Sequence, residues 1–139
     1  GKRYIALVEH SPAGNQGAIE APLVKDPEPT HWPRQKICHD SGRPSRTLWR
    51  IHERPIDEPL RQQGRTARLE LRPETGRTHQ IRVHLASPPE EGGLGTPILG
   101  DTLYGSESTA PRLCLHAEGL ALWRPYTNEW LKFESPAPF

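Results

Sequence analysis

The alternation of side chains at the start of the chain predicts a β-strand. From Arg3 to Glu9 the residues are rich in β-formers, and both alternating sets of positions are apolar. The two sets are Tyr4, Ala6 and Val8 on one face and Ile5 and Leu7 on the other. Because successive side chains of a strand point to opposite faces, we expect a central strand that is buried on both sides.

Further strands are predicted between turns marked by glycine, proline, asparagine and aspartate. They run from Gly17 to Leu23, from Arg34 to His39, from Arg46 to Arg54 and from Thr66 to Leu71. In the last of these, Ala67, Leu69 and Leu71 alternate cleanly and are expected to point inward. The chain up to this point is typical of an antiparallel meander.

The segment after Gly76 fits two patterns. Ile81, Val83 and Leu85 alternate as in a strand, but Ile81 and Leu85 also share one helical face with His84. Thr78 provides an N-cap candidate. We therefore predict a short helix from about Thr78 to Ala86, ended by the prolines and glycines that follow it.

The C-terminal region predicts a closing pair of strands, Leu113 to Trp123 and Glu129 to Phe133, around a turn. Only 33% of the residues are hydrophobic and 16 are proline, which favours a loop-rich globule over a helical bundle. The predicted fold class is α+β, a mainly antiparallel or mixed sheet with short helices. At 139 residues the chain is interpreted as one partial domain, residues 1–139.

Charge and cysteine content narrow the function classes. The chain has 18 Lys and Arg against 17 Asp and Glu, so any attraction for a polyanion must be local. Cys38 and Cys114 lack metal-ligand spacing, and no apolar run is long enough to span a membrane. We expect a cytoplasmic protein. Because the chain has no methionine and begins directly in a strand pattern, it is interpreted as a fragment.

Several common kinds of active site do not fit. His79 and His84 are five residues apart, whereas zinc-binding helices use a spacing of four, so no metal is predicted. The chain has no GxSxG motif of serine hydrolases, and its glycines near residues 92–105 precede no GK[ST] phosphate loop.

The arginines are more informative. Arg68 and Arg72 occupy polar positions of a predicted strand, where a solvent-exposed face explains them best. Arg77 and Arg82 instead flank the start of the predicted helix, where backbone N–H groups favour anions. For these two, recognition of phosphate or carboxylate is at least as good an explanation.

The stretch GRTHQIRVHL followed by TPILGDTLYG resembles the signature of the RluA-type RNA pseudouridine synthases. That signature is GRTHQIR-x-H, a short spacer, G-x-PI-x-GD and then YG. Upstream, KRYIALVEH resembles the K-x-Y-x-A-x-V segment of the family, and GAIEAPL and PRLCLHAEGLAL resemble two of its strands. The similarity covers nearly the whole chain.

The resemblance implies isomerisation of uridine to pseudouridine in ribosomal RNA, transfer RNA or both, with no cofactor. The essential aspartate of the family lies in an HRLD motif upstream of the K-x-Y segment, and this sequence has no such motif. Its aspartates, none preceded by Arg-Leu, are Asp26, Asp40, Asp57 and Asp101. The chain alone is therefore expected to be inactive, and Asp101 is expected to have a structural role.

The resemblance also implies roles for individual residues. Arg82 matches the arginine that pairs with the catalytic aspartate, and Tyr4 matches the tyrosine that stacks on the target base. Ile98 and Leu99 match the apolar wall of the uracil pocket. Arg77 and His79 are expected to organise the loop or contact phosphate. For Tyr4, an ordinary tyrosine at the start of a strand remains the alternative.

Two departures from the family pattern stand out. The spacer between His84 and Pro97 is long and carries Glu90 and Glu91, which would repel a phosphate backbone, so we expect this loop to point away from RNA. Thr96 stands where the family often has histidine. A non-catalytic RNA-binding module on the same scaffold is the alternative function. Loss of the upstream half is expected to expose apolar sheet surface and to promote self-association.

Overall fold

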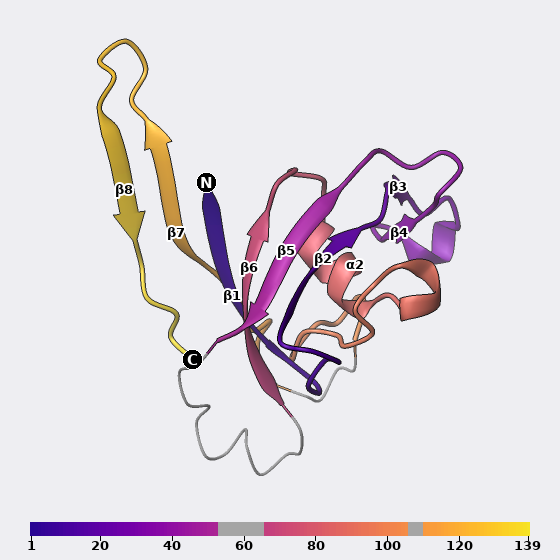
Figure 1. Ribbon diagram of the computed structural model, residues 1–139. Helices are drawn as coiled ribbons and strands as arrows, with labels where there is room; N and C mark the ends of the chain where they lie inside the picture. Colours follow the sequence, from indigo (N-terminus) through magenta and orange to yellow (C-terminus); the bar gives the residue numbers. More distant parts are fainter. Residues whose placement is uncertain (53–65, 106–109) are drawn as a thin grey trace.

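The fold is built on one six-stranded sheet with the strand order β2-β5-β6-β1-β7-β8 (Figure 1). The computed structural model describes residues 1–52, 66–105 and 110–139. The strands of this sheet are β1 (Lys2–Val8), β2 (Gln16–Glu20), β5 (Arg46–Ile51), β6 (Ala67–Pro73), β7 (Leu115–Trp123) and β8 (Trp130–Glu134). Every pairing between them is antiparallel. The predicted α+β class with a mainly antiparallel sheet is confirmed.

Strand β1 is central, as its two apolar faces predicted. It pairs with β6 on one side and with β7 on the other. Ile5, Ala6, Leu7 and Val8 are all at most 1% exposed, so both faces are covered. The C-terminal tail contributes to this core, because Ala137 and Phe139 are buried in the same cluster.

The predicted strand from Gly17 to Leu23 is in fact two elements. β2 ends at Glu20, and Pro22, which has no N–H to donate to a ladder, separates it from β3 (Leu23–Lys25). β3 pairs with β4 (Gln35–Ile37), which covers the middle of the predicted Arg34 to His39 strand, in a separate two-stranded sheet. Single 3-10 turns occur at Pro29–His31 and Pro89–Glu91.

The segment after Gly76, whose apolar positions fit both a strand and a helix, forms helix α2 (Gln80–Ala86). The prediction of a helix is confirmed. The predicted start and cap were wrong. The N-cap is His79, in the left-handed conformation with φ 55° and ψ 19°, and no side chain caps the helix. Thr78 lies in the preceding turn and is exposed. The left-handed residue turns the chain sharply into the helix, which excludes the extended cap expected of a threonine.

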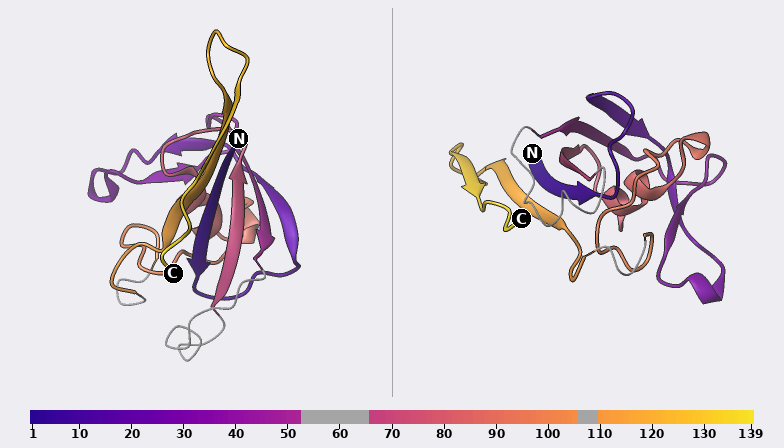
Figure 2. Two further views of the ribbon diagram at one scale, coloured as in Figure 1. Left: turned by 90° about the vertical axis from the view of Figure 1, so that its left-hand side faces the viewer. Right: turned by 90° about the horizontal axis from the view of Figure 1, so that it is seen from below.

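Helix α2 contacts β4, β5 and β6 and covers one face of the sheet (Figure 2). A buried chain of hydrogen bonds attaches it there. Gln80 Nε2 donates to Thr47 Oγ1 at 3.0 Å, and Thr47 Oγ1 lies 2.8 Å from His84 Nδ1. His84 Nε2 lies 2.9 Å from the carbonyl oxygen of Ala21, so the ring donates from Nε2 and accepts at Nδ1. Every polar atom of this buried histidine therefore has a partner.

We expect protonation of His84 to destabilise the fold. Burial lowers the pKa of His84, although the hydrogen bond to Ala21 partly opposes this. In the unfolded chain the ring takes up its proton near pH 6.5, so its contribution to stability is complete above about pH 6.5 and declines below it. The free energy of unfolding should therefore fall as the pH is lowered from about 7.5 to about 5.5.

The measurement is denaturant unfolding across this pH range for the wild type, His84→Gln and, as a control, the exposed histidine variant His39→Gln. His84→Gln should show a smaller pH dependence, and His39→Gln should match the wild type. An unchanged pH dependence in His84→Gln would contradict the assignment.

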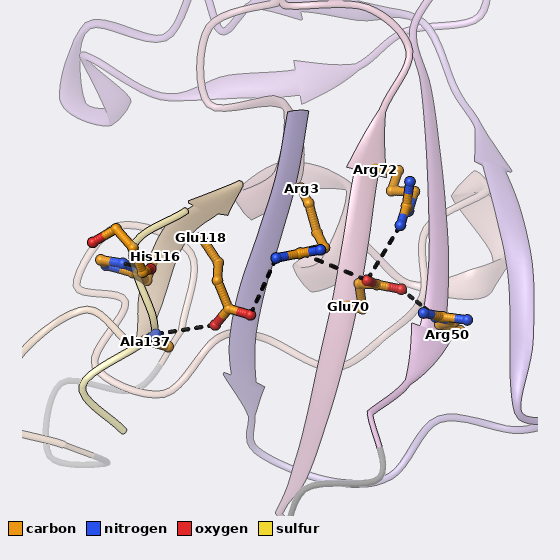
Figure 3. Close-up of polar contacts among 8 residues, drawn as sticks. Arg3, Arg50, Glu70, Arg72, His116, Glu118 and Ala137 are labelled. Carbon is orange, nitrogen blue, oxygen red and sulfur yellow. Dashed lines mark hydrogen bonds and ion pairs between the residues drawn. The ribbon is translucent and has the colours of Figure 1, made fainter. Parts of the chain in front are cut away.

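The opposite face of the sheet carries a row of charged side chains (Figure 3). Glu70 is 4% exposed and forms ion pairs with Arg3, Arg50 and Arg72, and Arg3 also pairs with Glu118. Burial would raise the pKa of the Glu70 carboxyl, but the hydrogen bond from Arg50 and the charges of the arginines hold it below its usual value. The C-terminal tail attaches to this row, since Ala137 N donates to Glu118 Oε2.

The prediction that Arg68 and Arg72 lie on a solvent-exposed face of β6 is therefore wrong for Arg68. Arg72 is exposed, but Arg68 is 2% exposed. Alternation assigned Arg68 and Glu70 to the polar side correctly, but it does not report that the tail and neighbouring ion pairs cover that side.

The β7–β8 hairpin projects beyond the rest of the sheet (Figure 1). It carries most of the large hydrophobic side chains that are exposed in the described part of the chain, namely Leu120, Trp123, Tyr126, Trp130 and Phe133. Trp123 and Trp130 pair directly across the strands and meet edge to face. No helix in the described ranges combines the length and apolar character needed to cross a bilayer.

Candidate functional site

A cavity of about 310 Å³ opens between the start of β1, the end of β6 and the first turn of α2. Four of the six residues predicted for the site line it: Tyr4, Arg77, His79 and Arg82. Pro73, Ile81 and Leu115 give it an apolar part, and Lys2 adds a further positive charge. The structure thus brings together residues that lie more than 70 positions apart in sequence.

The sheet register explains how Tyr4 reaches this cavity. Tyr4 lies opposite Leu71 of β6, and Leu71 lies opposite Trp49 of β5, so their side chains share a face. Thr47 of β5, which is bonded to α2, belongs to the same face. Tyr4 therefore points to the side of the sheet on which α2 presents Arg82.

Arg82 is held by a bidentate ion pair with Asp101. Its Nε donates to Asp101 Oδ2 at 3.0 Å and its Nη2 to Oδ1 at 2.7 Å. The Asp101 side chain is completely buried, while 17% of the Arg82 side chain is exposed. This fork geometry fixes the guanidinium plane and leaves Nη1 without a hydrogen bond to any described residue.

Asp101 also organises the turn that follows it. Its Oδ1 accepts the backbone N–H groups of Leu103 and Tyr104, and its carbonyl oxygen accepts that of Gly105. Burial would raise the pKa of the Asp101 carboxyl, but the hydrogen bonds from Arg82 and Tyr104 hold it below its usual value. A charged, fully bonded carboxylate in this position fits the structural role expected for Asp101.

Arg77 and His79 are held by different contacts. Arg77 Nε donates to the carbonyl oxygen of Pro44, while its backbone N–H donates to Gln80 Oε1. His79 Nδ1 lies 2.8 Å from the hydroxyl of Tyr104. Burial, and next the charge of Arg82, lower the pKa of His79, so the ring favours its neutral form.

Sequence reasoning missed Tyr104 as a site residue. Its hydroxyl accepts the backbone N–H of Gln35 and contacts His79, and its ring centroid lies 5.3 Å from Arg82 Cζ and 5.5 Å from Arg34 Cζ. The only signal in the sequence was the YG pair at the end of the family signature, which contains Tyr104. The position of this tyrosine in the sequence does not indicate which residues it contacts. Burial raises the pKa of this hydroxyl, so it is a hydrogen-bond donor near neutral pH.

Ile98 and Leu99 lie elsewhere. They are 0% and 3% exposed within the hydrophobic core, and neither lines the cavity. The backbone explains this, because Leu99 N donates to Leu7 O while Leu99 O accepts from Cys114 N. The segment is thus inserted between β1 and residue 114, and its side chains fill the core. The apolar wall nearest Tyr4 and Arg82 is formed by Ile81 and Leu115 instead.

The departures from the family pattern lie outside the cavity. No residue of the loop from 87 to 95 lines it. Thr96 is buried and bonds through Oγ1 to the backbone N–H and carbonyl of His10. Among the described residues, no group of three or more His, Cys, Asp or Glu side chains is arranged to hold a metal ion.

Comparison with known proteins decides the family. The model of the RNA pseudouridylate synthase family matches residues 1–87. The chain belongs to the RNA pseudouridylate synthase family. The resemblance found in its sequence motifs is therefore confirmed.

Similar sequences point to one branch of the pseudouridylate synthases. The dual-specificity RNA pseudouridine synthase RluA of Pasteurella multocida is 42% identical over 99% of this chain. The RluA of Escherichia coli strain K12 is 38% identical over the same share. In both cases the match covers 58% of the relative's length, so the chain spans little more than half of these proteins.

Solved structures of pseudouridylate synthases share the fold. Human RNA pseudouridylate synthase domain containing 1 matches 99% of this chain and 55% of its own, with a TM-score of 0.79 and 27% identity. Human RNA pseudouridylate synthase domain containing 4 matches with a TM-score of 0.66 at 24% identity, which supports the fold alone.

Proposed function

We propose that this chain is the part of an RNA pseudouridine synthase that supplies the tyrosine and arginine of the active site. The observation that carries the proposal is the meeting of Tyr4 and Arg82 in one cavity. The reaction breaks the glycosidic bond between N1 of uracil and the ribose and joins C5 of the base to the same sugar carbon. C5 loses its proton and N1 takes one up, so the product is an isomer of uridine and atoms and electrons balance without a cofactor.

The geometry supports a role for Arg82 in orienting an acid. Asp101 engages Nε and Nη2, so Nη1 is available to a second carboxylate. A guanidinium at contact distance favours the ionised form of a carboxylic acid. The catalytic aspartate would come from the part of the relatives' length that this chain does not span.

The cavity also suits an extruded base. An enzyme that acts on a base takes it out of the stack, at a cost of a few kcal/mol, and holds it against aromatic or apolar side chains. Tyr4 offers an aromatic ring, and Ile81 and Leu115 offer apolar surface beside it. Arg77 and Lys2 at the same opening add positive charge for the RNA phosphates.

The test is a tritium-release assay on transfer RNA and large-subunit ribosomal RNA transcripts. We expect no pseudouridine from the chain alone, and pseudouridine from a fusion in which the N-terminal segment of the Pasteurella multocida enzyme precedes Gly1. The matched control is the same fusion with the aspartate of the HRLD motif changed to asparagine. A folded fusion that forms no pseudouridine, while the whole Pasteurella enzyme does, would overturn the proposal.

A non-catalytic RNA-binding module is the second candidate. One observation favours it: among the described residues, no aspartate lines the cavity, and Asp101, which pairs with Arg82, is fully engaged in the scaffold. The same assay separates the two functions, because a fusion that contains a non-catalytic module would release no tritium from the transcripts. The use of ribosomal RNA, transfer RNA or both, and a cytoplasmic location, are parts of the proposal.

We also propose that the chain self-associates through the exposed aromatic surface of the β7–β8 hairpin. Sedimentation velocity over a range of concentrations should show dimers or larger species in the wild type. Trp130→Ser should weaken this association, and a strictly monomeric wild type would contradict it.

A further inference from the structure

The cavity contains a histidine whose ring contacts a tyrosine that lies outside the cavity lining. His79 is the N-cap of α2 and has a left-handed backbone, a conformation that is uncommon in residues other than glycine. Such residues persist when surrounding contacts determine them. Here the contacts are the bond from Val83 N to His79 O and the approach of the Tyr104 hydroxyl to Nδ1.

The hydrogen bonds of Tyr104 determine which way its hydroxyl proton points. The backbone N–H of Gln35 can only donate, so at that contact of 2.8 Å the phenol oxygen accepts. The proton of the hydroxyl is then directed to its other polar neighbour, His79 Nδ1, also at 2.8 Å. With Nδ1 as acceptor, the proton of the neutral ring lies on Nε2.

The same turn holds both cavity residues through Tyr104. Asp101 Oδ1 accepts the backbone N–H of Tyr104 and the Nη2 group of Arg82. The ring of Tyr104 lies edge to face with His79, with centroids 5.6 Å apart, and faces Arg82 Cζ at 5.3 Å. A displacement of Tyr104 would therefore move both the histidine and the arginine.

Nε2 of His79 is the polar atom of the ring that remains for a ligand. His79 lines the cavity, and Nε2 has no hydrogen-bond partner among the residues that the structure describes. A uridine nucleotide offers acceptors at its two carbonyl oxygens and its phosphate, and donors at N3–H and the ribose hydroxyls. An N–H donor at Nε2 is thus complementary to the acceptors of the proposed substrate. An unprotonated Nε2 is itself an acceptor and could not donate to them.

We propose that Tyr104 is a positioning residue that holds His79 in the neutral tautomer protonated at Nε2, so that this N–H donates to an oxygen of the bound uridine nucleotide. The contact with uridine rests on the proposed function, and the tautomer does not. The lowered pKa of His79 agrees with this arrangement, because it keeps the ring neutral at physiological pH.

The tautomer is tested by long-range ¹H–¹⁵N correlation of histidine rings in the ¹⁵N-labelled chain at pH 7.5. The signals of His79 are assigned by their loss in His79→Gln. We expect an unprotonated Nδ1 and a protonated Nε2. A proton on Nδ1 in the wild type would overturn the proposal, and this reading needs no variant that might fold poorly.

The role of Tyr104 is tested with Tyr104→Phe, which keeps the ring and removes the hydroxyl. We expect a mixture of tautomers and an upward shift of the titration midpoint of His79, because the hydrogen bond that favours the neutral ring is lost. The matched control is Tyr126→Phe at a fully exposed tyrosine, which should leave His79 unchanged. A purely structural tyrosine would leave tautomer and midpoint as they are, and that result would refute the assignment.

The donor is tested by adding uridine 5′-monophosphate, uridine or inorganic phosphate to the labelled chain. We expect the Nε2–H signal to shift with the nucleotide. A shift with uridine alone assigns the contact to the nucleoside, and one with phosphate alone assigns it to the phosphate. No shift with any of the three would overturn the donor role.

The NMR measurements of His79 do not depend on pseudouridine formation by the fusion. The expected tautomer together with an inactive fusion would refute the proposed function alone. An active fusion with a proton on Nδ1 of His79 would refute this inference alone.

Discussion

Arg82→Ala should abolish pseudouridine formation in the active fusion and should also destabilise the chain. The alanine removes the group proposed to orient the catalytic aspartate. It also leaves the Asp101 carboxylate, which is completely buried, without its bidentate partner. Breaking a buried ion pair by removing one partner is expected to lower the free energy of unfolding by about 3–5 kcal/mol. The two effects are measured by tritium release and by urea unfolding.

Two variants separate the contributions to this loss. Arg82→Lys keeps the charge but not the planar fork, so it should recover part of the stability and little of the activity. Arg124→Ala removes an arginine that pairs with Glu129 at 3.2 Å on the exposed hairpin. Because exposed pairs contribute about 0–1 kcal/mol, this control should leave both readings nearly unchanged. Equal stability losses in Arg82→Ala and Arg124→Ala would contradict the burial argument.

Motif matching found Arg82 but not its partner within the chain. The sequence assigned Arg82 to an absent aspartate and Asp101 to the scaffold, as separate roles. The structure joins them, since Asp101 holds two nitrogens of Arg82 and the turn that carries Tyr104. Contacts between a helix and a distant turn have no signature in local spacing, so such pairings emerge only in three dimensions.

The strands were the most predictable part of the fold. Alternation placed β1 at the centre of the sheet because apolar side chains at every position from Tyr4 to Val8 leave no face for solvent. Alternation assigned Arg68 and Glu70 to the correct face of the sheet. It could not predict that this face is also covered, so that both side chains are buried. The polarity of a residue reports which side it faces, and burial depends on what packs there.

Local backbone geometry accounts for the wrong cap and for the placement of Ile98 and Leu99. Thr78 has the chemistry of an N-cap, yet His79 takes that place in the left-handed conformation, with its ring in contact with the Tyr104 hydroxyl. Ile98 and Leu99 have the chemistry of a pocket wall, yet the backbone bonds to Leu7 and Cys114 direct them into the core. In both cases tertiary contacts override a preference that was correct for the residue type.

Gly100→Ala should be among the most destabilising single changes in the chain. Gly100 has φ 76°, a region that disfavours residues with a Cβ atom, and a Cβ built there would lie 1.8 Å from the backbone carbonyl oxygen of Arg112. Backbone cannot give way as a side chain can, so the segment before Asp101 would have to move. We expect a loss of more than about 4 kcal/mol, in the range reserved for disrupted cores and strained backbones, and a displaced Arg82–Asp101 pair.

Gly14→Ala is the matched control for this change. Gly14 has a similar φ of 83°, but a Cβ there would have no atom within 4 Å. Its cost should be limited to the left-handed conformation, about 1–2 kcal/mol. Urea unfolding measures both, and the difference between them isolates the collision with Arg112. The chemical shifts of the Arg82 side chain should change in Gly100→Ala and stay constant in Gly14→Ala, since the turn that begins at Gly100 is what brings the Asp101 carboxylate to α2. Similar losses of unfolding free energy in the two variants would show that residues 98–101 can shift at little cost. The close approach of Gly100 to Arg112 would then not be needed to hold Asp101 against Arg82.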